Sequence, residues 1–366
     1  MSSFALERVF GDDGTGMDES AVYPNPDLPP RPILRAFARA LDLARAHEGA
    51  TAPNPPVGCV LLDANGQELA AGAHRRAGMP HAEADAINEA RAAGLADKID
   101  SVVVTLEPCN HHGRTPPCAE AILGTGARLV WIACRDPNPE VTGGGAERLR
   151  AAGLDVHFLS DLHHHPEAAV LLGEANRLLA PFAKRSQAGL PFITIKQAIS
   201  ASGSMVPVAG RKTFTSAASL ELAHRLRRRA DAILTGSGTV LADNPLFTVR
   251  RVPDHSEKQR MLVILDGRRR VTETYLDAAR QRGFALHLAD DVHHALEAIG
   301  AAGGMEVLVE AGPNLTTHLL TTGLWDEHVL IEQAANPDGT DRVTVRRNLV
   351  SQAYSHGKEK DVLGHH

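Results

Sequence analysis

The chain has 366 residues, with 38 Lys and Arg against 44 Asp and Glu and a formal net charge of −6. That length suggests two domains, each able to bury a core, and 43% hydrophobic against 22% charged residues excludes a disordered chain. The negative net charge argues against broad, sequence-independent binding of nucleic acid. Four cysteines in so long a chain exclude a disulfide scaffold, and they favour metal-binding or catalytic thiols in a reducing compartment.

The N-terminal half predicts an α/β domain over residues 32–186. Residues 1–31 are acidic and rich in Gly and Pro, without the apolar core of a signal peptide, so we expect a flexible tail. No uncharged apolar run reaches the ~18 residues of a membrane span, and we expect a cytoplasmic protein. The predicted elements are a helix from Ile33, a hairpin over 57–63 and 68–72, helices over 82–93 and 119–123, and strands over 101–106 and 128–134.

A change of pattern predicts a second domain over residues 187–366. A helix over 167–184 is followed by Ser186–Pro191, which breaks the helical pattern before the strand Phe192–Lys196. Further apolar runs, separated by helical or loop segments, lie at 232–235, 261–266, 284–288 and 306–309. This half is therefore also expected to be α/β.

The strongest functional signal is a set of metal-ligand residues, His81, Cys109 and Cys118. One imidazole and two thiolates leave the fourth position of a tetrahedral zinc site open for water, as in a catalytic zinc site. Glu83, two residues after His81, completes the H-x-E and P-C pattern of the zinc deaminases, in which Glu transfers protons and is not a ligand. The pattern predicts hydrolytic deamination at an amidine-like ring carbon, with Glu83 as the catalytic acid and base.

A structural zinc site is the alternative interpretation. Such a site is normally closed by a fourth protein ligand. The two remaining cysteines, Cys59 and Cys134, lie inside apolar strand patterns and are expected to be buried core thiols.

Eight residues separate the two predicted cysteine ligands, where zinc deaminases usually have two. This insertion, with the segments Asn54–Gly58, Gly72–Gly78 and Asp136–Pro139, resembles the bifunctional pyrimidine deaminase/reductase family of riboflavin biosynthesis over about residues 34–335. The resemblance implies a cytidine-deaminase-like α/β/α layered domain followed by a dihydrofolate-reductase-like α/β domain. It also implies zinc and NADPH as cofactors, and a diaminopyrimidinone ribosylamino 5′-phosphate as substrate.

By this resemblance, five residues of the first domain line the substrate pocket: Asn54, His74, Arg114, Asp136 and Asn138. Arg114 lies in the inserted loop, where a guanidinium suits the geometry of a phosphate; a solvated loop Arg is the alternative. Asn54, Asp136 and Asn138 each adjoin a proline, and the residues by themselves favour turn formation at these positions.

In the second half, the segments His224–Arg227, Asp231–Pro245 and Glu310–Leu315 resemble the reductase domain of the same family. The resemblance implies that NADPH binds at Gly236, Ser237, Gly238, Thr239 and Gly312. It implies that Lys196, Asp243 and Glu310 bind the substrate, whose ribosyl chain is reduced to a ribityl chain. Taken alone, glycines after a strand let the backbone approach a phosphate, but a plain Gly-rich turn is an equally simple interpretation.

Some positions depart from the pattern of the family. Ser202 and Ser204 stand where the family has an acidic and a basic residue, and Leu220 stands where it has Arg. After the Asp326-Glu327 region the family continues with closing strands, whereas this chain reads Gln333-Ala334-Ala335-Asn336-Pro337, and we interpret it as ending in a short polar tail. A monofunctional deaminase whose second domain only binds substrate or holds an oligomer together is therefore an alternative.

A nucleic-acid-editing or RNA-binding module on the same zinc fold is a further hypothesis. It would need a basic groove with aromatic side chains for base stacking, whereas aromatic residues make up only 4% of the chain. The main basic run, Arg227–Arg229, is interpreted as a solvated helix face. We expect a small-molecule substrate, no nucleic-acid or membrane partner, and a homo-oligomer formed through the C-terminal domain.

Overall fold

The computed structural model describes residues 30–110, 117–138, 144–208, 213–334 and 339–348. The chain forms two compact units, one from Met1–Thr51 and Pro55–Leu179 and the other from Ala52–Asn54 and Ala180–His366. This division falls within helix α6 (Pro166–Ala188), and so does the predicted division between residues 186 and 187. Across the described ranges, no helix combines the length and the apolar character that crossing a membrane requires.

The first unit is built on a five-stranded sheet with the order β2-β1-β3-β4-β5. β1 pairs antiparallel with β2 and β3, whereas β3, β4 and β5 are parallel. The strands are β1 (Gly58–Leu62), β2 (Glu68–Ala73), β3 (Ser101–Leu106), β4 (Leu129–Cys134) and β5 (Asp155–Phe158). The helices are α2 (Pro30–Ala46), α3 (Ala82–Ala92), α4 (Cys118–Leu123), α5 (Gly145–Ala151) and most of α6.

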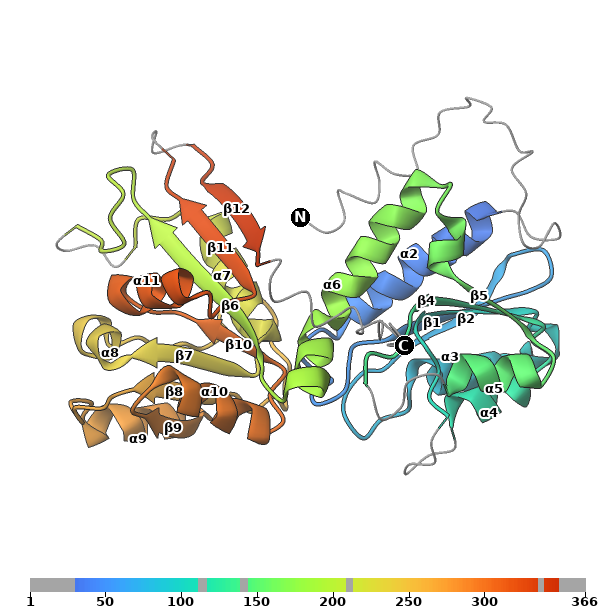
Figure 1. Cartoon of the computed structure of the whole chain (residues 1–366), viewed down its shortest axis with the longest axis horizontal. Coiled ribbons are helices and arrows are strands. Elements are labelled where there is room, and N and C mark those ends of the chain that lie inside the picture. The colour runs from blue at the N-terminus through green and yellow to red at the C-terminus, as the bar shows by residue number, and fades with distance from the viewer. Residues whose placement is uncertain (1–29, 111–116, 139–143, 209–212, 335–338, 349–366) are drawn as a thin grey trace, which may run out of the picture. The chain divides into compact units, whose positions relative to one another are not determined.

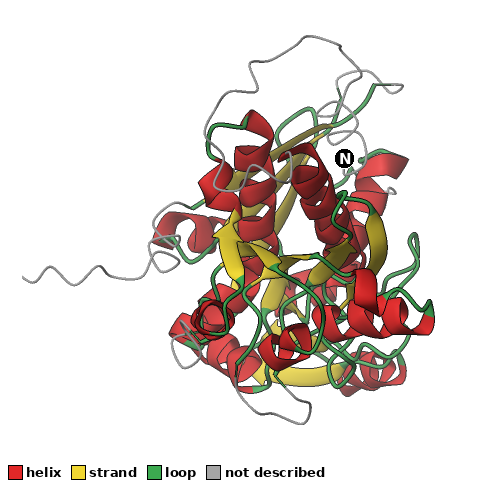
Figure 2. Cartoon of the chain, turned by 90° about the vertical axis from the view of Figure 1, so that its right-hand side faces the viewer, coloured by secondary structure: helices red, strands yellow, loops and turns green. Residues whose placement is uncertain are grey.

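Helices cover both faces of this sheet (Figure 1). α2 and α6 lie side by side on one face, where Arg45 and Glu174 form an ion pair of 2.7 Å, and α3, α4 and α5 lie on the other. β1, β3 and β4 are buried along their whole length, which explains their continuous apolar sequences. The unit is the predicted α/β/α layered domain, and Figure 2 shows strands flanked by helices.

Gly58 is required by the close packing of α2 on β1. A Cβ at this position would lie 2.0 Å from the carbonyl oxygen of Ala40, a backbone atom of a buried helix. We expect Gly58→Ala to lower the free energy of unfolding of this unit by about 3 kcal/mol. Urea unfolding followed by circular dichroism measures this change.

The matched control is Gly173→Ala on α6, at an exposed position where an added Cβ would meet nothing within 4 Å. This change is expected to raise the free energy of unfolding by about 0.5–1 kcal/mol, because Gly is a poor helix former. Equal stability of the two variants would show that α2 does not pack this closely on β1.

The second unit is built on a seven-stranded sheet with the order β12-β11-β6-β10-β7-β8-β9. All neighbouring strands are parallel except β12, which is antiparallel to β11. The strands are β6 (Phe192–Ile199), β7 (Ala232–Gly236), β8 (Met261–Leu265), β9 (Ala285–Ala289), β10 (Glu306–Val309), β11 (Glu327–Glu332) and β12 (Arg342–Arg347). The helices are α7 (Ala217–Arg229), α8 (Ser237–Asp243), α9 (Glu273–Gln281), α10 (Val292–Ala301) and α11 (Pro313–Thr322).

Alternate side chains of these strands build a core on each face of the sheet. Leu234 and Val309 pack in one hydrophobic cluster with residues of α10 and α11. Their sequence neighbours Ile233 and Leu308 point to the opposite face, in clusters with residues of α7, α8 and α9. Successive side chains of a strand point to opposite faces of the sheet. Because helices cover both faces of this parallel sheet, both sets of side chains have to be apolar.

The order of the strands reverses next to β10. The chain runs from β6 through β7 and β8 to β9, then returns to place β10 between β6 and β7 and β11 on the other side of β6. In open parallel sheets, ligands bind outside the carboxyl ends of the strands at such a reversal. The carboxyl ends of β6, β10 and β7 therefore form the edge at which a ligand site is expected.

The structure corrects three interpretations of the sequence. The chain does not end in a short polar tail after Gln333–Pro337, because strand β12 follows and pairs with β11 along its full length. Most side chains of β12 are exposed, so its sequence carries no apolar run that would signal a strand. Helix α6 does not break at Ser186; it continues to Ala188 and ends at Gly189, whose φ of 71° is left-handed. In addition, α2 begins at Pro30, within the last residues of the predicted tail.

Candidate functional site

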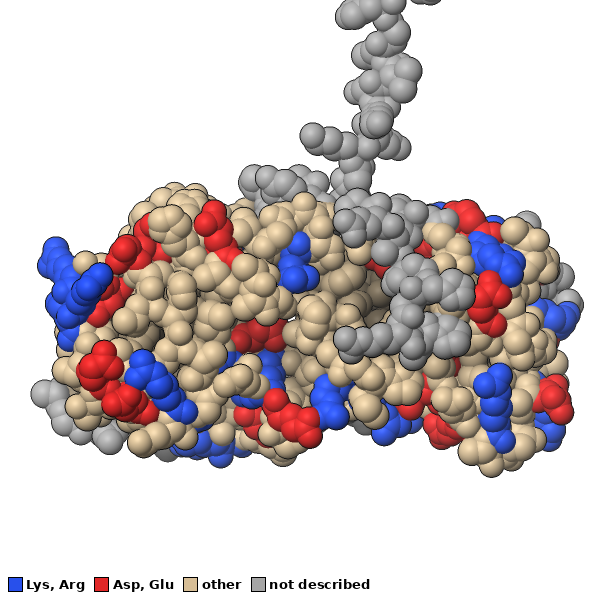
Figure 3. Space-filling view, turned by 90° about the horizontal axis from the view of Figure 1, so that it is seen from below, with Lys and Arg blue, Asp and Glu red and all other residues tan. Residues whose placement is uncertain are grey.

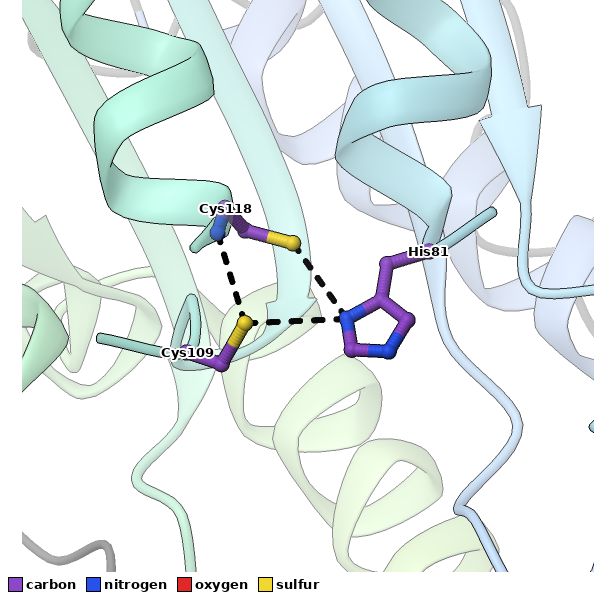
Figure 4. Close-up of side chains that lie close together, drawn as sticks. All are labelled: His81, Cys109 and Cys118. Carbon is purple, nitrogen blue, oxygen red and sulfur yellow. Dashed lines mark hydrogen bonds between the residues drawn. The ribbon is translucent and has the colours of Figure 1, made fainter. Parts of the chain in front are cut away.

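Three elements of the first unit bring His81, Cys109 and Cys118 together. His81 precedes the first turn of α3, Cys109 follows β3, and Cys118 is the first residue of α4. His81 Nδ1 lies 3.7 Å from Cys109 Sγ and 3.3 Å from Cys118 Sγ (Figure 4). Zinc bonds of about 2.0–2.3 Å at a tetrahedral angle place nitrogen and sulfur ligands about 3.5 Å apart. The three side chains therefore fit a single zinc ion.

The described residues offer no fourth His, Cys, Asp or Glu in this group, whose ligand atoms lie within 4.8 Å of one another. A set of three protein ligands is that of a catalytic zinc, whereas structural zinc normally has four. The remaining cysteines, Cys59 and Cys134, are free and buried, as predicted. The geometry of the described site thus favours the catalytic interpretation.

The surroundings of Cys109 favour a thiolate. The backbone N–H of Cys118 donates to Cys109 Sγ at 3.3 Å. A hydrogen bond from the Cys118 thiol lowers the pKa of Cys109 to about 4. Burial opposes this shift, and His81 adds to it. The pKa of Cys118 is raised, because its thiol donates to Cys109 and is buried. These contacts favour the thiolate form of Cys109, which metal binding requires.

Glu83 is the buried acid of this site. It lies in the first turn of α3 and is only 3% exposed, and burial raises its pKa. A carboxyl group with a raised pKa holds a proton more readily than an exposed one, which suits a group that accepts a proton and returns it. Its place two residues after His81 holds it near the ligand set, where it interacts with Cys109 and Cys118.

His74 packs directly against His81. Its side chain is buried, and the two rings meet edge to face with centroids 5.3 Å apart. His74 Nδ1 lies 3.0 Å from the carbonyl oxygen of Pro80. A carbonyl only accepts, so Nδ1 carries the proton and Nε2 of the neutral ring is an acceptor. Burial lowers the pKa of His74 and so favours this neutral form.

The other predicted substrate residues of this unit have different settings. Asp136 Oδ1 accepts a hydrogen bond from the backbone of Asn138 at 2.9 Å, the turn geometry that these residues favour by themselves. Asn54 lies between α2 and β1, in a three-residue segment grouped with the second unit. Arg114 falls outside the described residues.

Glu107 is a positioning residue that sequence analysis missed. Its carboxylate is buried and accepts hydrogen bonds from the backbone N–H groups of Ala146, at 3.0 Å, and Asp136, at 3.4 Å. Next to it, a Cβ on Gly145 would lie 1.8 Å from the carbonyl oxygen of Pro108, so the start of α5 rests on this segment. Together these contacts fix the chain just before Cys109. The only signal in the sequence was the Glu-Pro-Cys order of the motif.

In the second unit, the structure brings together two of the three predicted substrate residues. Lys196 Nζ lies 3.0 Å from Glu310 Oε2, and Arg227 of α7 pairs with both carboxylate oxygens of Glu310. Burial by itself would raise the pKa of Glu310, but the positive charges of Lys196 and Arg227 hold this pKa well below its usual range. Asp243 is exposed at the end of α8 and, within the described ranges, forms no ion pair with these cations.

The basic run at the end of α7 is not the solvated helix face that the sequence suggested. Arg227 pairs with Glu310, and Arg229 Nη2 lies 2.7 Å from Glu306 Oε1 and 2.6 Å from Glu327 Oε1. All three carboxylates are buried. Glu306 lies in β10, Glu310 follows β10, and Glu327 lies in β11. All three are far from α7 in the sequence, so no local pattern predicts these ion pairs. Sequence analysis missed that Arg227 pairs with Glu310, a predicted substrate residue.

Four of the five predicted cofactor residues, Gly236–Thr239, lie where β7 ends and α8 begins, and the fifth, Gly312, precedes α11. We call Gly236–Thr239 the cradle. The N–H of Gly312 donates to Thr239 Oγ1 at 3.0 Å and so ties the loop after β10 to the cradle. A Cβ at Gly236 or Gly238 would meet no heavy atom within 4 Å. The backbone of the cradle is thus open to close approach, which fits the phosphates of a dinucleotide.

Comparison with known proteins assigns both units. The family description "Cytidine and deoxycytidylate deaminase zinc-binding region" matches residues 32–134, and "RibD C-terminal domain" matches residues 191–332. The riboflavin biosynthesis protein RibD of Escherichia coli K12 is 35% identical over 327 residues, which cover 80% of this chain and 85% of that protein. This chain belongs to the RibD family. RibD of Mycobacterium tuberculosis H37Rv is 38% identical over 299 residues, covering 79% of this chain and 83% of that protein.

Solved structures of related proteins share the fold of this chain. The deaminase/reductase of Thermotoga maritima has a TM-score of 0.70 at 30% identity, and the match covers 85% of this chain and 89% of that one. Acinetobacter baumannii RibD has a TM-score of 0.68 at 28% identity, with the same coverage. RibD membership confirms the predicted fold classes, the deaminase and reductase activities in riboflavin biosynthesis, and the use of zinc and NADPH. The monofunctional alternative is not favoured, because the reductase match spans residues 191–332.

Proposed function

We propose that this RibD-family enzyme carries out two consecutive reactions. The first unit deaminates a diaminopyrimidinone ribosylamino 5′-phosphate to the aminouracil, and the second reduces the ribosyl chain of that product to a ribityl chain. The observation that carries the proposal is the convergence of His81, Cys109 and Cys118 beside the buried Glu83. The Thermotoga maritima neighbour is named for the same pair of activities.

In the deamination, the protein moves one proton and holds the ring. Zinc, when bound, supplies a Lewis acid that makes water a nucleophile near neutral pH. Glu83 takes a proton from the attacking water and delivers it to the leaving nitrogen, so that a C–O bond replaces a C–N bond and ammonia departs. His74 Nε2 accepts a hydrogen bond from the substrate. The residues proposed to hold the remaining substrate groups are Asn54, Arg114, Asp136 and Asn138.

In the reduction, the side chains position two ligands at the carboxyl edge of the sheet. We assign NADPH to the cradle and Gly312, and the ribosyl chain to Lys196, Asp243 and Glu310. NADPH, when bound, supplies the hydride, so positioning matters more than a side-chain nucleophile. The support is that β6, β7 and β10 end at the same edge of the sheet.

Excess positive charge near Glu310 supports a phosphorylated substrate. His224 Nδ1 accepts a hydrogen bond from the backbone of Arg250 at 2.8 Å. Burial, Arg227 and Arg250 together lower the pKa of His224 to about 4, and burial and Arg227 lower that of Arg250. Cations that lower the pKa of their neighbours are stabilised by an added anion. We assign the 5′-phosphate of the ribosyl chain to this group in the reduction step.

We also propose the domain bounds, the oligomeric state and the cellular location of the enzyme. We take residues 32–186 and 187–366 as its deaminase and reductase domains. β12 is an edge strand on which Val343 and Val345 are 39% and 54% exposed, and we propose that a second copy covers this edge. Because zinc-ligand thiols must stay reduced, we place the enzyme in the cytoplasm.

Ammonia release and NADPH oxidation, followed on the same protein with and without zinc, test the order of the two reactions. The zinc-loaded enzyme is expected to release ammonia from the diaminopyrimidinone and then to oxidise NADPH. After chelation of zinc, it should release no ammonia and oxidise NADPH only when the aminouracil is supplied. Equal NADPH oxidation with both compounds after chelation would contradict the order. No ammonia from the loaded enzyme would contradict the deaminase assignment.

A further inference from the structure

One carboxylate of α3 holds the chain on both sides of His74. Asp85 Oδ2 accepts a hydrogen bond from the backbone N–H of Ala73 at 3.1 Å, and it accepts from Nε and Nη2 of Arg75 at 3.3 and 3.2 Å. Ala73 and Arg75 are the residues that precede and follow His74. The place of the His74 ring is therefore tied to α3.

The contact with Ala73 satisfies an N–H group at the edge of the sheet. β2 is the terminal strand of its sheet and lies next to β1. The N–H of His74 donates to the carbonyl oxygen of Val57, on the side of β1. The N–H of Ala73 points the opposite way, because successive N–H groups of a strand alternate in direction. Asp85 supplies the acceptor that a further strand would provide, and its charge strengthens the hydrogen bond.

The helix that carries Asp85 also carries the metal ligand His81. The N–H of Asp85 donates to the carbonyl oxygen of His81 at 2.9 Å, so the two residues lie one turn apart. Figure 4 shows the His81 ring directed from the start of α3 towards the two cysteines. The helix packs closely on β2, since a Cβ at Gly72 would lie 2.4 Å from the backbone nitrogen of Ala86. Asp85 thus fixes where His74 lies relative to the metal ligand.

The contact with Arg75 is the weaker part of this arrangement. The side chain of Arg75 is 59% exposed, whereas that of Asp85 is 23% exposed. Exposed ion pairs contribute little, because water competes for both charges. Figure 3 shows Lys and Arg interspersed with Asp and Glu over the face that it views, so neighbouring opposite charges are general on this surface. The hydrogen bond to the backbone is therefore the part that positions His74.

We propose that Asp85 is a positioning residue of the deamination. Through the N–H of Ala73 it holds His74 where Nε2 accepts a hydrogen bond from the substrate. The proposal rests on the assignment of His74 as a substrate contact. A contact that substrate and transition state share equally affects KM and leaves kcat unchanged. Loss of Asp85 should accordingly weaken substrate binding without changing turnover or zinc content.

The kinetics of ammonia release by the zinc-loaded full chain test the proposal. Asp85→Ala is expected to raise KM for the diaminopyrimidinone about tenfold, the effect of one lost hydrogen bond, and to keep kcat within about threefold of the wild type. Asp85→Asn keeps an oxygen that can accept from Ala73, so its KM should stay within about threefold of the wild type. Arg75→Gln should do the same. The matched control is Glu89→Ala, which removes an exposed acid of the same helix and should change neither constant.

A double variant shows whether Asp85 acts through His74. His74→Ala by itself should raise KM about as much as Asp85→Ala does. Combining the two substitutions should raise KM no further, because the ring that Asp85 positions is already absent. Multiplication of the two effects would show that Asp85 acts independently of His74, contrary to the proposal.

Nitrogen NMR of protein labelled at its histidines gives a second measurement, without turnover. The His74 signals are identified by their absence from His74→Ala. In the wild type they should report a proton on Nδ1, which faces the carbonyl oxygen of Pro80. In Asp85→Ala they should report exchange between the two tautomers, because the ring is no longer held. Unchanged His74 signals in this variant would contradict the positioning role.

The outcomes separate this proposal from the one on which it rests. If His74→Ala raises KM and Asp85→Ala does not, His74 remains a substrate contact and Asp85 does not position it. If neither variant changes KM, the assignment of His74 as a substrate contact is wrong as well. A lower kcat at unchanged KM in Asp85→Ala would mean that Asp85 serves only the fold. If Asp85→Ala unfolds at a lower temperature than the wild type, Asp85→Leu, which keeps a branched side chain without an acceptor, should show the same rise in KM.

Discussion

Replacing Glu83 by Gln is expected to slow ammonia release by about a thousandfold. Gln keeps the size of the side chain and its fit at a position that is 3% exposed, but it can no longer take a proton from the attacking water. The zinc content should not change, because Glu83 is not one of the three ligands that the geometry groups together. The measurements are ammonia release from the diaminopyrimidinone and metal content by atomic absorption.

Two controls isolate the proton-transfer role. Glu89→Gln changes an exposed residue of the same helix, and its ammonia release should match the wild type. The Glu83 variant should still oxidise NADPH normally when the aminouracil is supplied, since reduction belongs to the other unit. Ammonia release within a few-fold of the wild type, with zinc retained, would refute Glu83 as the proton carrier.

The Glu310→Gln variant is expected to lose the other activity, NADPH oxidation. NADPH oxidation should fall at least about a hundredfold, because Glu310 orders Lys196 and Arg227 at the carboxyl edge of the sheet. The free energy of unfolding of this unit should fall by about 3 kcal/mol, since two cations lose a buried carboxylate. Deamination should be unchanged, and Glu297→Gln, exposed on α10, should affect neither activity.

A second substitution distinguishes positioning from stability. Adding Arg227→Gln to Glu310→Gln removes one of the unpaired charges, so part of the lost stability should return, whereas NADPH oxidation should not. Recovery of oxidation together with stability would mean that Glu310 serves only the fold. Oxidation near the wild-type rate in a folded Glu310→Gln variant would place the reductase site elsewhere.

The ion pairs of Glu310 also predict a response to acid. Its pKa in the folded protein lies below the unfolded value of about 4.3. The unfolded state therefore takes up the proton first as pH falls, and the stabilising contribution, complete above that value, is lost progressively below it. The difference in free energy of unfolding between wild type and Glu310→Gln should accordingly shrink below about pH 4.

The zinc site was largely predictable because its residues sit in a local pattern. His81 and Glu83 lie two residues apart at the start of one helix, and Cys109 and Cys118 flank one insertion, so spacing and residue type alone identified a catalytic metal set. The buried strands were predictable for a similar reason, because strands covered on both faces are continuously apolar. What spacing did not show is that Glu107 reaches forward to Asp136 and Ala146 to hold the ligand segment.

The second unit contains features that local sequence patterns did not predict. β12 was taken for a polar tail, because an edge strand with exposed side chains gains its structure from hydrogen bonds to β11 and not from apolar residues of its own. Arg227 and Arg229 were taken for a solvated face, because nothing near them in the sequence shows that Glu306, Glu310 and Glu327 are buried beside them.

By itself, then, the sequence of this protein determined its metal chemistry, its two α/β domains and its family. The tertiary structure alone decided which charges are paired and which strand closes the sheet. The physical reason is how far apart in the sequence the interacting residues lie. Backbone periodicity and ligand spacing are set by residues a few positions apart, whereas a buried ion pair or an edge strand depends on groups that only the folded chain brings into contact.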